Sequence, residues 1–282
     1  MRSRAPGPAA IATYGVLLVF AALSLGPLLV MGFDALKTTT EMARNPAGVP
    51  REPTLVNLEY LVAKYPGGTF VRSVSNSILV SSGATVLSLL FASLAAYAFA
   101  KIPFGGRKVL FTLLIATMIL PVEITIPPLY IMFARIHWLN SYKVQIVPFA
   151  ASVFSLFMLR QYLMAVPDSL IEAARMEGAS HGRVFAMIVA PLCTPVLSVL
   201  AVLNFMGRFN DYFWPVIMVN TAEFKPVMTV LPTIATDANS MFPPSEYLMA
   251  GCAVITLPVL IVFLVFRRSF MRGASLGVSV KE

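Results

Sequence analysis

The sequence has little charge and few of the residue types from which disulfide frameworks and metal sites are built. Of its 282 residues, 12% are charged and 58% are hydrophobic, whereas soluble domains carry about 25% charged residues. The two cysteines, Cys193 and Cys252, belong to no CxxC pair and fall in apolar stretches, so we expect buried packing residues. His137 and His181 stand alone in expected loops. We therefore expect no disulfide framework and no metal site.

The motifs of nucleotide binding and catalysis are also missing from the sequence. No GxxxxGK[ST] phosphate loop occurs, and Gly105-Gly106-Arg107-Lys108 lacks its spacing. No Ser/His/Asp set, paired carboxylates or HExxH segment offers an enzyme its chemistry. The net charge of +8 comes from cations that flank apolar stretches instead of forming one face, which argues against nucleic-acid binding.

What the chain has instead is a series of long apolar stretches. A helix needs roughly 20 mostly apolar residues to cross a bilayer, and six stretches meet this length: about 11–31, 74–100, 109–134, 144–166, 187–220 and 247–266. The first exceeds the apolar part of a signal peptide and precedes no cleavage site, so we expect it to be retained as an anchor. The sequence predicts an all-α membrane protein with six transmembrane helices.

The charges between these stretches predict the orientation. An even number of spans places both termini on one side. Lys and Arg outnumber acids in the segments that an inner N-terminus would leave inside, whereas the other segments are nearly balanced. This bias predicts an N-in/C-in topology. Residues 32–72 and 221–247 then lie outside, where their prolines favour loops with short helices, such as one over 57–64. Either segment is a candidate contact for a partner.

Several polar residues interrupt the predicted third and fifth spans. A carboxylate at membrane depth usually faces protein or water, so Glu123 either lines a pathway or lies at the outer interface, if the helix ends near Pro127 and Pro128. Arg208 and Asp211 are spaced for an ion pair on one helical face. Alternatively, this half of the helix lies in the interfacial aromatic belt. The possible pathway or gate residues are Glu123, Asn204, Arg208, Asn210, Asp211, Tyr212 and Trp214.

The polar connection between the predicted fourth and fifth spans has the signals of two short helices. Pro167 ends the preceding helix, and Ser169 with Glu172 fits the S-x-x-E capping box at a helix start. Gly178 fits a left-handed C-terminal cap, and Ser180 an N-cap. We expect a stiff elbow at the membrane surface, with a face that Ala173 and Ala174 leave flat enough for another protein.

This connection resembles a known family motif. Its spacing EAA-x3-G-x9-I-x2-P resembles the cytoplasmic EAA loop of permease subunits of bacterial ATP-binding-cassette importers; the matching residues, with the capping serine, are Ser169, Glu172, Ala173, Ala174, Gly178, Ile188 and Pro191. Further stretches at 35–41, 76–77, 95–100 and 210–215 are similar to the second, six-span permease of the maltose-type carbohydrate branch. Phe209 departs from the tryptophan usual in that branch, which leaves the subgroup and substrate open.

The resemblance implies a type I ABC importer permease fold in the bacterial cytoplasmic (inner) membrane. It implies three parts: residues 1–72 with the first span and outer loop, a five-span core over 73–266 with the coupling loop at 167–190, and a cytoplasmic tail over 267–282. The tail resembles a segment that reaches between ATPase subunits in this branch; a disordered polar tail is the alternative.

The resemblance also implies a noncatalytic subunit that forms half of a sugar pathway. Its implied partners are a second permease, two ATPase subunits, an extracytoplasmic solute-binding protein and membrane lipid. No cofactor is expected in this chain, because ATP and magnesium would be bound by the ATPases. The elbow would transmit ATP-driven movement to the spans. A permease for glycerol 3-phosphate or a glycerophosphodiester is the alternative within this class, and an autonomous secondary transporter the alternative outside it.

Overall fold

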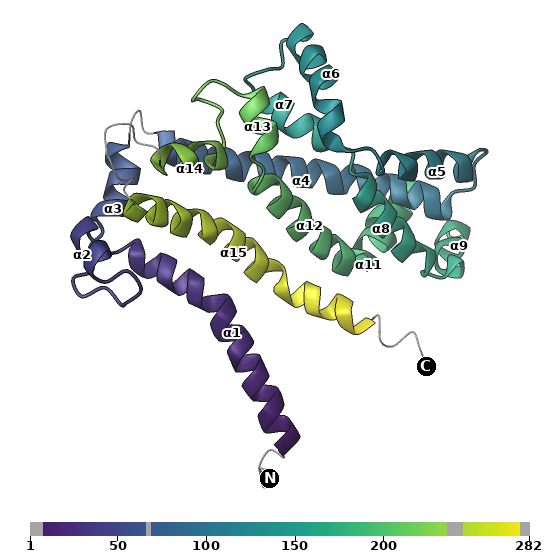
Figure 1. Ribbon diagram of the computed structural model, residues 1–282. Helices are drawn as coiled ribbons and strands as arrows, with labels where there is room; N and C mark the ends of the chain where they lie inside the picture. The colour runs from purple at the N-terminus through teal and green to yellow at the C-terminus, as the bar shows by residue number, and fades with distance from the viewer. Residues whose placement is uncertain (1–7, 66–68, 236–244, 277–282) are drawn as a thin grey trace. The chain divides into compact units, whose positions relative to one another are not determined.

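The computed structural model describes residues 8–65, 69–235 and 245–276. Within these ranges the regular structure is helical and contains no strand (Figure 1), as the apolar stretches predict. The longest helices are α1 (Pro8–Asp34), α4 (Thr69–Lys101) and α15 (Ser245–Leu276). The last continues into the predicted tail, whose residues 277–282 lie outside the described part of the chain.

Shorter helices fill the rest of the described chain. Their order is α2 (Thr39–Arg44), α3 (Val56–Glu59), η1 (Tyr60–Lys64), α5 (Arg107–Thr117), α6 (Val122–Arg135), α7 (Tyr142–Ile146), η3 (Val147–Phe149), α8 (Val153–Met164), α9 (Asp168–Met176), α10 (His181–Val184), η4 (Phe185–Val189), α11 (Ala190–Leu192), α12 (Thr194–Phe209), α13 (Phe213–Met218) and α14 (Val227–Ala235). The short helix predicted over 57–64 is present as α3 and η1.

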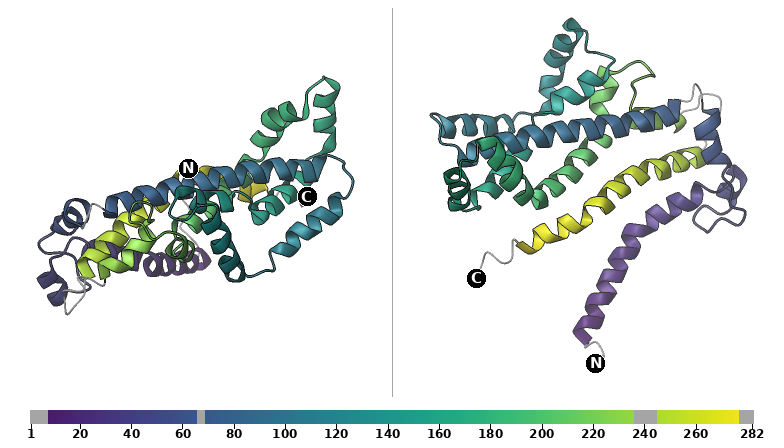
Figure 2. Two further views of the ribbon diagram at one scale, coloured as in Figure 1. Left: turned by 90° about the horizontal axis from the view of Figure 1, so that it is seen from above. Right: turned by 180° about the vertical axis from the view of Figure 1, so that it is seen from behind.

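The described helices provide four to six candidate membrane spans. Four segments are long and apolar enough by themselves: Ala12–Asp34, Thr69–Lys101, Tyr142–Met164 and Ser245–Arg267. Two further pairs reach this length only together, α5 with α6 at an angle of 96° and the α10–α11 segment with α12 at 76°. Figure 2 shows the bend between α5 and α6. The count of six therefore depends on each bent pair forming one span.

The predicted third and fifth spans are broken helices. The third breaks between Thr117 and Val122, where Pro121 is the N-cap of α6. The fifth breaks at Cys193, between prolines 191 and 195, and again after Phe209. Proline lacks the N–H of a helix interior and clashes with the preceding turn, so helices restart at these positions. Cys193 is buried and Cys252 half-buried, and both are free thiols.

The chain forms two compact units, and the first contains residues 1–71 and 230–257. Here the segment that follows α1 is organised around Lys37, which is fully buried. Its Nζ lies 2.7 Å from Asp34 Oδ1 and donates to the carbonyl of Asn45 at 2.7 Å. Asn57 donates to the carbonyls of Ala35 and Lys37. A buried ammonium must find such partners, so these contacts fix the loop that follows α1.

The second unit contains residues 72–229 and 258–282 and holds both candidate functional regions. The C-terminal half of α4 packs with α8 and α12 around one apolar cluster, which includes Ala96, Leu159 and Leu200. A second cluster surrounds Trp214 and Phe133. The alanine-rich end of α4 therefore packs against protein and not against lipid alone. Its small side chains allow close approach between helices.

Candidate functional site

The first candidate region is the elbow, residues 167–190, between α8 and α12. Its first helix, α9, starts at Asp168 with Pro167 as N-cap and has no side-chain capping bond. The capping box predicted for Ser169 and Glu172 is therefore wrong, because the N-cap lies two residues before Ser169, which is already inside the helix. Asp168 occupies the first turn instead, where a carboxylate is stabilised by the helix dipole.

The middle of the elbow follows the sequence prediction closely. Gly178 has a left-handed φ of 85°, and its N–H donates to the carbonyl of Arg175 at 3.0 Å. The N–H of Ala179 reaches back to Ala174 at 3.0 Å. This pair of bonds is a Schellman cap, which favours glycine at the left-handed position. Ser180 caps α10 by accepting from the N–H of Arg183. Both capping predictions are confirmed.

Two buried side chains anchor the elbow in the helical core. Ile171 of α9 and Val184 of α10 join the apolar cluster of α4, α8 and α12. Ile188 lies partly buried against the same cluster, within the π-helical turn η4. Pro191 is exposed in the first turn of α11. The elbow therefore has a packed inner side along both of its short helices.

The other side of the elbow presents charged and apolar groups. Glu172 and Ala173 are exposed, and Leu170 and Met176 are 44% and 89% exposed. Ala174, by contrast, packs partly against the core, so only Ala173 contributes to the predicted flat face. Exposed large apolar groups beside charges are typical of surfaces that contact another protein. The elbow thus combines a fixed base with an uncovered outer face.

A lysine that the sequence analysis did not single out ties the elbow to the end of α4. Lys101 Nζ donates to the carbonyl of Val166 at 2.6 Å and to Asp168 Oδ1 at 2.5 Å. The Lys101 side chain is 4% exposed, whereas that of Asp168 is 75% exposed. Nearby, the hydroxyl of Tyr97 lies 3.2 Å from Nδ1 of His181. We call the three-residue contact of Lys101, Val166 and Asp168 the Lys101 clamp.

The second candidate region is a polar cavity of about 190 Å³ between α4, η3 with the residues that precede α8, and α12. It is lined by Ala84, Pro148, Phe149, Ala151, Ser152, Asn204 and Arg208. The amide of Asn204 donates to Ser155 Oγ at 3.0 Å and to the carbonyl of Leu200 at 2.8 Å. Its Oδ1 accepts from Ser88 at 3.4 Å. These contacts hold the amide in one orientation at the cavity wall.

The ion pair predicted within the fifth span is present beside this cavity. Arg208 Nη1 lies 3.0 Å from Asp211 Oδ2, with both side chains largely shielded. The guanidinium also stacks on the ring of Phe149 at 3.8 Å. Asp211 Oδ1 accepts from the backbone N–H of Trp214 at 3.3 Å, which holds the start of α13. Arg208 is therefore positioned by a carboxylate and an aromatic ring together.

The structure gathers some of the predicted pathway residues and separates others. Asn204, Arg208 and Asp211 lie together, and Trp214 is buried beside them with its Nε1 donating to Val144. Tyr212, Asn210 and Glu123 are exposed and do not line the cavity. The sequence analysis missed Phe149, Ser152 and Ser155, although Pro148 inside a predicted span was a signal of irregular backbone.

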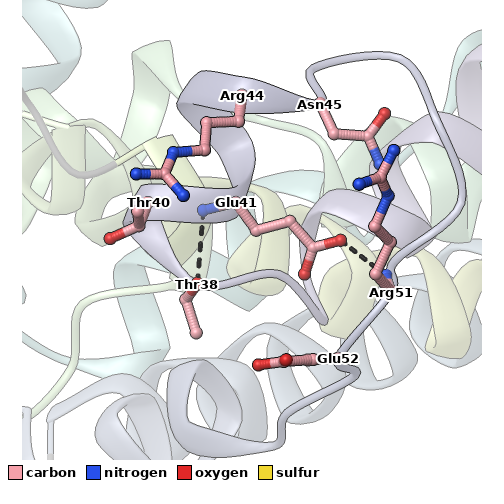
Figure 3. A pocket seen from close by; sticks show the side chains of 7 residues that line it. All are labelled: Thr38, Thr40, Glu41, Arg44, Asn45, Arg51 and Glu52. Carbon is pink, nitrogen blue, oxygen red and sulfur yellow. Dashed lines mark hydrogen bonds between the residues drawn. The ribbon is translucent and has the colours of Figure 1, made fainter.

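The third candidate region is a pocket of about 280 Å³ in the first unit, on the segment 38–52. Figure 3 shows its lining: Thr38, Thr40, Glu41, Arg44, Asn45, Arg51 and Glu52. Glu41 accepts the backbone N–H of Arg51 at 2.5 Å. This hydrogen bond is the main cause of a lowered pKa of the Glu41 carboxyl; desolvation opposes it, and hydrogen bonds from Glu52 and Asn45 and the charge of Lys37 lower the pKa further. The pocket therefore presents charges of both signs.

Comparison with known proteins gives one family over most of the chain. The family described as "Binding-protein-dependent transport system inner membrane component" matches residues 86–275. The arabinooligosaccharides transport system permease protein of Bacillus subtilis (strain 168) is 28% identical over 256 residues, 90% of this chain and 90% of that protein. The sn-glycerol-3-phosphate transport system permease protein of Pectobacterium atrosepticum is 33% identical over 198 residues, 70% of each chain.

Solved structures agree with this family at the level of the fold. A chain from the crystal structure of a bacterial ABC transporter involved in the import of the acidic polysaccharide alginate has a TM-score of 0.81 at 22% identity, covering 95% of this chain and 100% of that one. A chain from the complex of an alginate ABC transporter with its pentasaccharide-bound periplasmic protein has a TM-score of 0.61 at 14% identity, covering 93% and 94%. The described helices thus have the type I ABC permease fold.

Proposed function

This chain belongs to the family of binding-protein-dependent transport system inner membrane components, and we propose that it forms half of the translocation pathway of an ATP-driven sugar importer. The names of its relatives support the importer role and the solute class, since one serves arabinooligosaccharides. The sn-glycerol-3-phosphate permeases among its relatives support the second candidate, a glycerol phosphate importer. In either case this chain is a noncatalytic subunit.

The partners of this proposed subunit follow from the family and from the functions that the chain leaves to others. A second permease would complete the pathway, two ATPase subunits would bind ATP and magnesium, and an extracytoplasmic binding protein would deliver the solute. The complex of the alginate transporter with a periplasmic protein supports the last of these. We place the protein in the bacterial cytoplasmic membrane with six spans and both termini inside, following the bias of its cations.

The proposed coupling site is the outer face of the elbow. The observation that carries it is the contrast between buried Ile171 and Val184 on one side and exposed Leu170 and Met176 on the other. A surface that receives force must be fixed to the spans that move, because a loose loop would absorb the displacement. The residues proposed for ATPase coupling are Ser169, Glu172, Ala173, Ala174, Gly178, Ile188 and Pro191, with Ala174 and Ile188 acting from the packed side.

Site-directed cross-linking tests this role in the assembled transporter. Met176→Cys should react with a thiol cross-linker on an ATPase subunit and label only with reagents that reach the cytosol. Val49→Cys is the matched control, because Val49 is 65% exposed on a segment proposed to lie outside. Labelling of Met176→Cys from the outer side, or cross-linking to no ATPase subunit, would contradict the docking role.

The polar cavity and the pocket on the segment 38–52 are the proposed contacts for solute and binding protein. Asn204, Arg208 and Asp211 would line the pathway at the cavity, while Glu123, Asn210, Tyr212 and Trp214 remain proposed as neighbouring gate residues. An autonomous secondary transporter remains the competing class. Solute uptake into liposomes by this chain alone, without ATP or partner subunits, would favour that class over the importer.

A further inference from the structure

The polar cavity lies where one candidate span loses its regular helix. Within the segment Tyr142–Met164, α7 passes through the 3-10 turn Val147–Phe149, and α8 begins only at Val153. Irregular backbone at membrane depth is tolerated where it is buried in protein or lines a water-filled space. At about 30 Å³ of liquid per molecule, the cavity has room for about six waters. It is therefore large enough for part of a small hydrated solute.

The charges around the cavity compensate one another. Arg208 is the charged member of its described lining, and Asp211 holds its guanidinium at 3.0 Å. Two helix ends also meet the lining with opposite signs: Ser152 is the N-cap of α8, and Arg208 lies in the last turn of α12. The positive end of one dipole thus offsets the negative end of the other. The wall is polar but has no uncompensated cation.

The groups on this wall are held in place before any solute arrives. Phe149 supports the Arg208 guanidinium on one side and packs edge-on against Trp214 at 5.2 Å. Arginine has five N–H donors, so it can serve Asp211 and still donate to a solute. The Asn204 amide is fixed by Ser155 and Ser88, and its oxygen has a second lone pair. Such a wall suits hydroxyl groups, which both donate and accept.

We propose that the polar cavity is a subsite for one uncharged sugar ring or polyol, and that the Arg208–Asp211 pair disfavours anionic solutes there. A phosphate or carboxylate would need an unpaired cation to offset its desolvation, and Asp211 removes that possibility by neutralising Arg208. This inference rests on the proposed function, because it assumes that solute passes the cavity. A neutral cavity fits an importer of uncharged sugars and does not fit an importer of glycerol phosphate or of an acidic polysaccharide.

The neutrality of the cavity is measured by thiol labelling in the full transporter reconstituted in nanodiscs. Ala151→Cys places a thiol on an exposed part of the lining, in a background without Cys193 and Cys252. It is treated with methanethiosulfonates carrying a neutral hydroxyethyl, an anionic sulfonatoethyl or a cationic trimethylammonium-ethyl group. Relative to a free thiol, we expect the anionic and cationic rates to change by the same factor, within about twofold. A clear preference for either charge would overturn the proposal.

Two variants test whether the ion pair sets this neutrality. Asp211→Asn should raise the anionic-to-cationic rate ratio by about fivefold or more, because it leaves Arg208 uncompensated. The double variant Arg208→Gln with Asp211→Asn should return the ratio to its starting value, which also checks that the cavity still forms. An unchanged ratio in Asp211→Asn would show that the pair does not control the potential, against the proposal.

Solute protection then tests occupancy of the same site. Uncharged di- and trisaccharides in excess should slow the labelling of Ala151→Cys, whereas sn-glycerol 3-phosphate at equal concentration should not. Equal protection by the phosphate, or no protection by any saccharide, would overturn the proposal even if ATP-driven uptake is intact. A complex that is protected by saccharides but performs no ATP-driven uptake would instead refute the proposed function and support the subsite.

Discussion

Replacing Lys101 by methionine should weaken the attachment of the elbow to the end of α4 without unfolding the core. The substitution keeps the apolar stem of the side chain but removes the ammonium that bonds Val166 and Asp168. Because Asp168 is 75% exposed, its ion pair contributes less than about 1 kcal/mol. The bond from the shielded ammonium to the Val166 carbonyl is charge-assisted and contributes about 1.5–3 kcal/mol. The free energy needed to open the Lys101 clamp should therefore fall by about 2 kcal/mol, which is roughly a 30-fold change in the opening equilibrium.

Hydrogen exchange and transport coupling measure this loss in the reconstituted complex. Amides at the start of α9 should exchange roughly 30-fold faster in Lys101→Met, and less solute should be transported per ATP hydrolysed. Lys101→Arg keeps a cation in reach and should retain most of the coupling. Asp168→Asn should have a small effect, because its carboxylate is solvated. Exchange and coupling equal to the unsubstituted protein in Lys101→Met, or a larger defect in Asp168→Asn, would refute the clamp as the connection.

The remaining predictions concern the cap, the anchor and the outer loop. Gly178→Val should destabilise the elbow by about 1–2 kcal/mol because φ is positive there, whereas Gly178→Asn should be tolerated; protease sensitivity of the elbow distinguishes them. Ile171→Ala should cost about 2–4 kcal/mol and Ile171→Val about 1 kcal/mol, so transport should decline in that order, and equal effects would contradict the anchoring role. Since the folded-state pKa of Glu41 is lowered, its contribution to stability is present above the unfolded-state pKa and is lost as pH falls through the folded-state pKa. Protection of the Arg51 amide, corrected for intrinsic exchange, should therefore fall in acid, and this pH dependence should be absent in Glu41→Gln, whose side-chain oxygen accepts a hydrogen bond but does not titrate.

The sequence predicted those features that depend on local backbone rules. Gly178 and Ser180 act as caps because left-handed geometry and N-cap hydrogen bonding involve only neighbouring residues. The Arg208–Asp211 pair likewise joins residues three positions apart in the sequence, although Asp211 lies just beyond the end of α12 at Phe209. The start of α9 was misjudged because Pro167, and not Asp168 or Ser169, is its N-cap. Asp168 lies in the first turn, where Lys101, 67 positions earlier, binds its carboxylate.

Features that join distant segments could not be predicted from the sequence. Lys101 reads as one more cation flanking a span, and only the packing of α4 against the elbow brings it to Val166. The cavity wall combines Ala84, Phe149 and Asn204 from three helical regions, none of which marks a site by itself. The bends within the third and fifth spans could not be predicted either, because apolar length says nothing of direction; Pro121 redirects the chain by beginning a new helix.

An unbroken helix connects the two candidate regions of the second unit. Lys101 at the end of α4 belongs to the clamp, Ser88 hydrogen-bonds Asn204, and Ala84 lines the cavity. From Lys101 to Ala84 the helix rises about 25 Å at 1.5 Å per residue, and no proline or glycine interrupts this stretch. A displacement applied at the elbow would therefore move the cavity wall with little loss in bending, since sharp kinks usually require such an interruption. The helix that fixes the elbow would then also change the shape of the polar cavity, so that no further structural element is needed to transmit the movement between them.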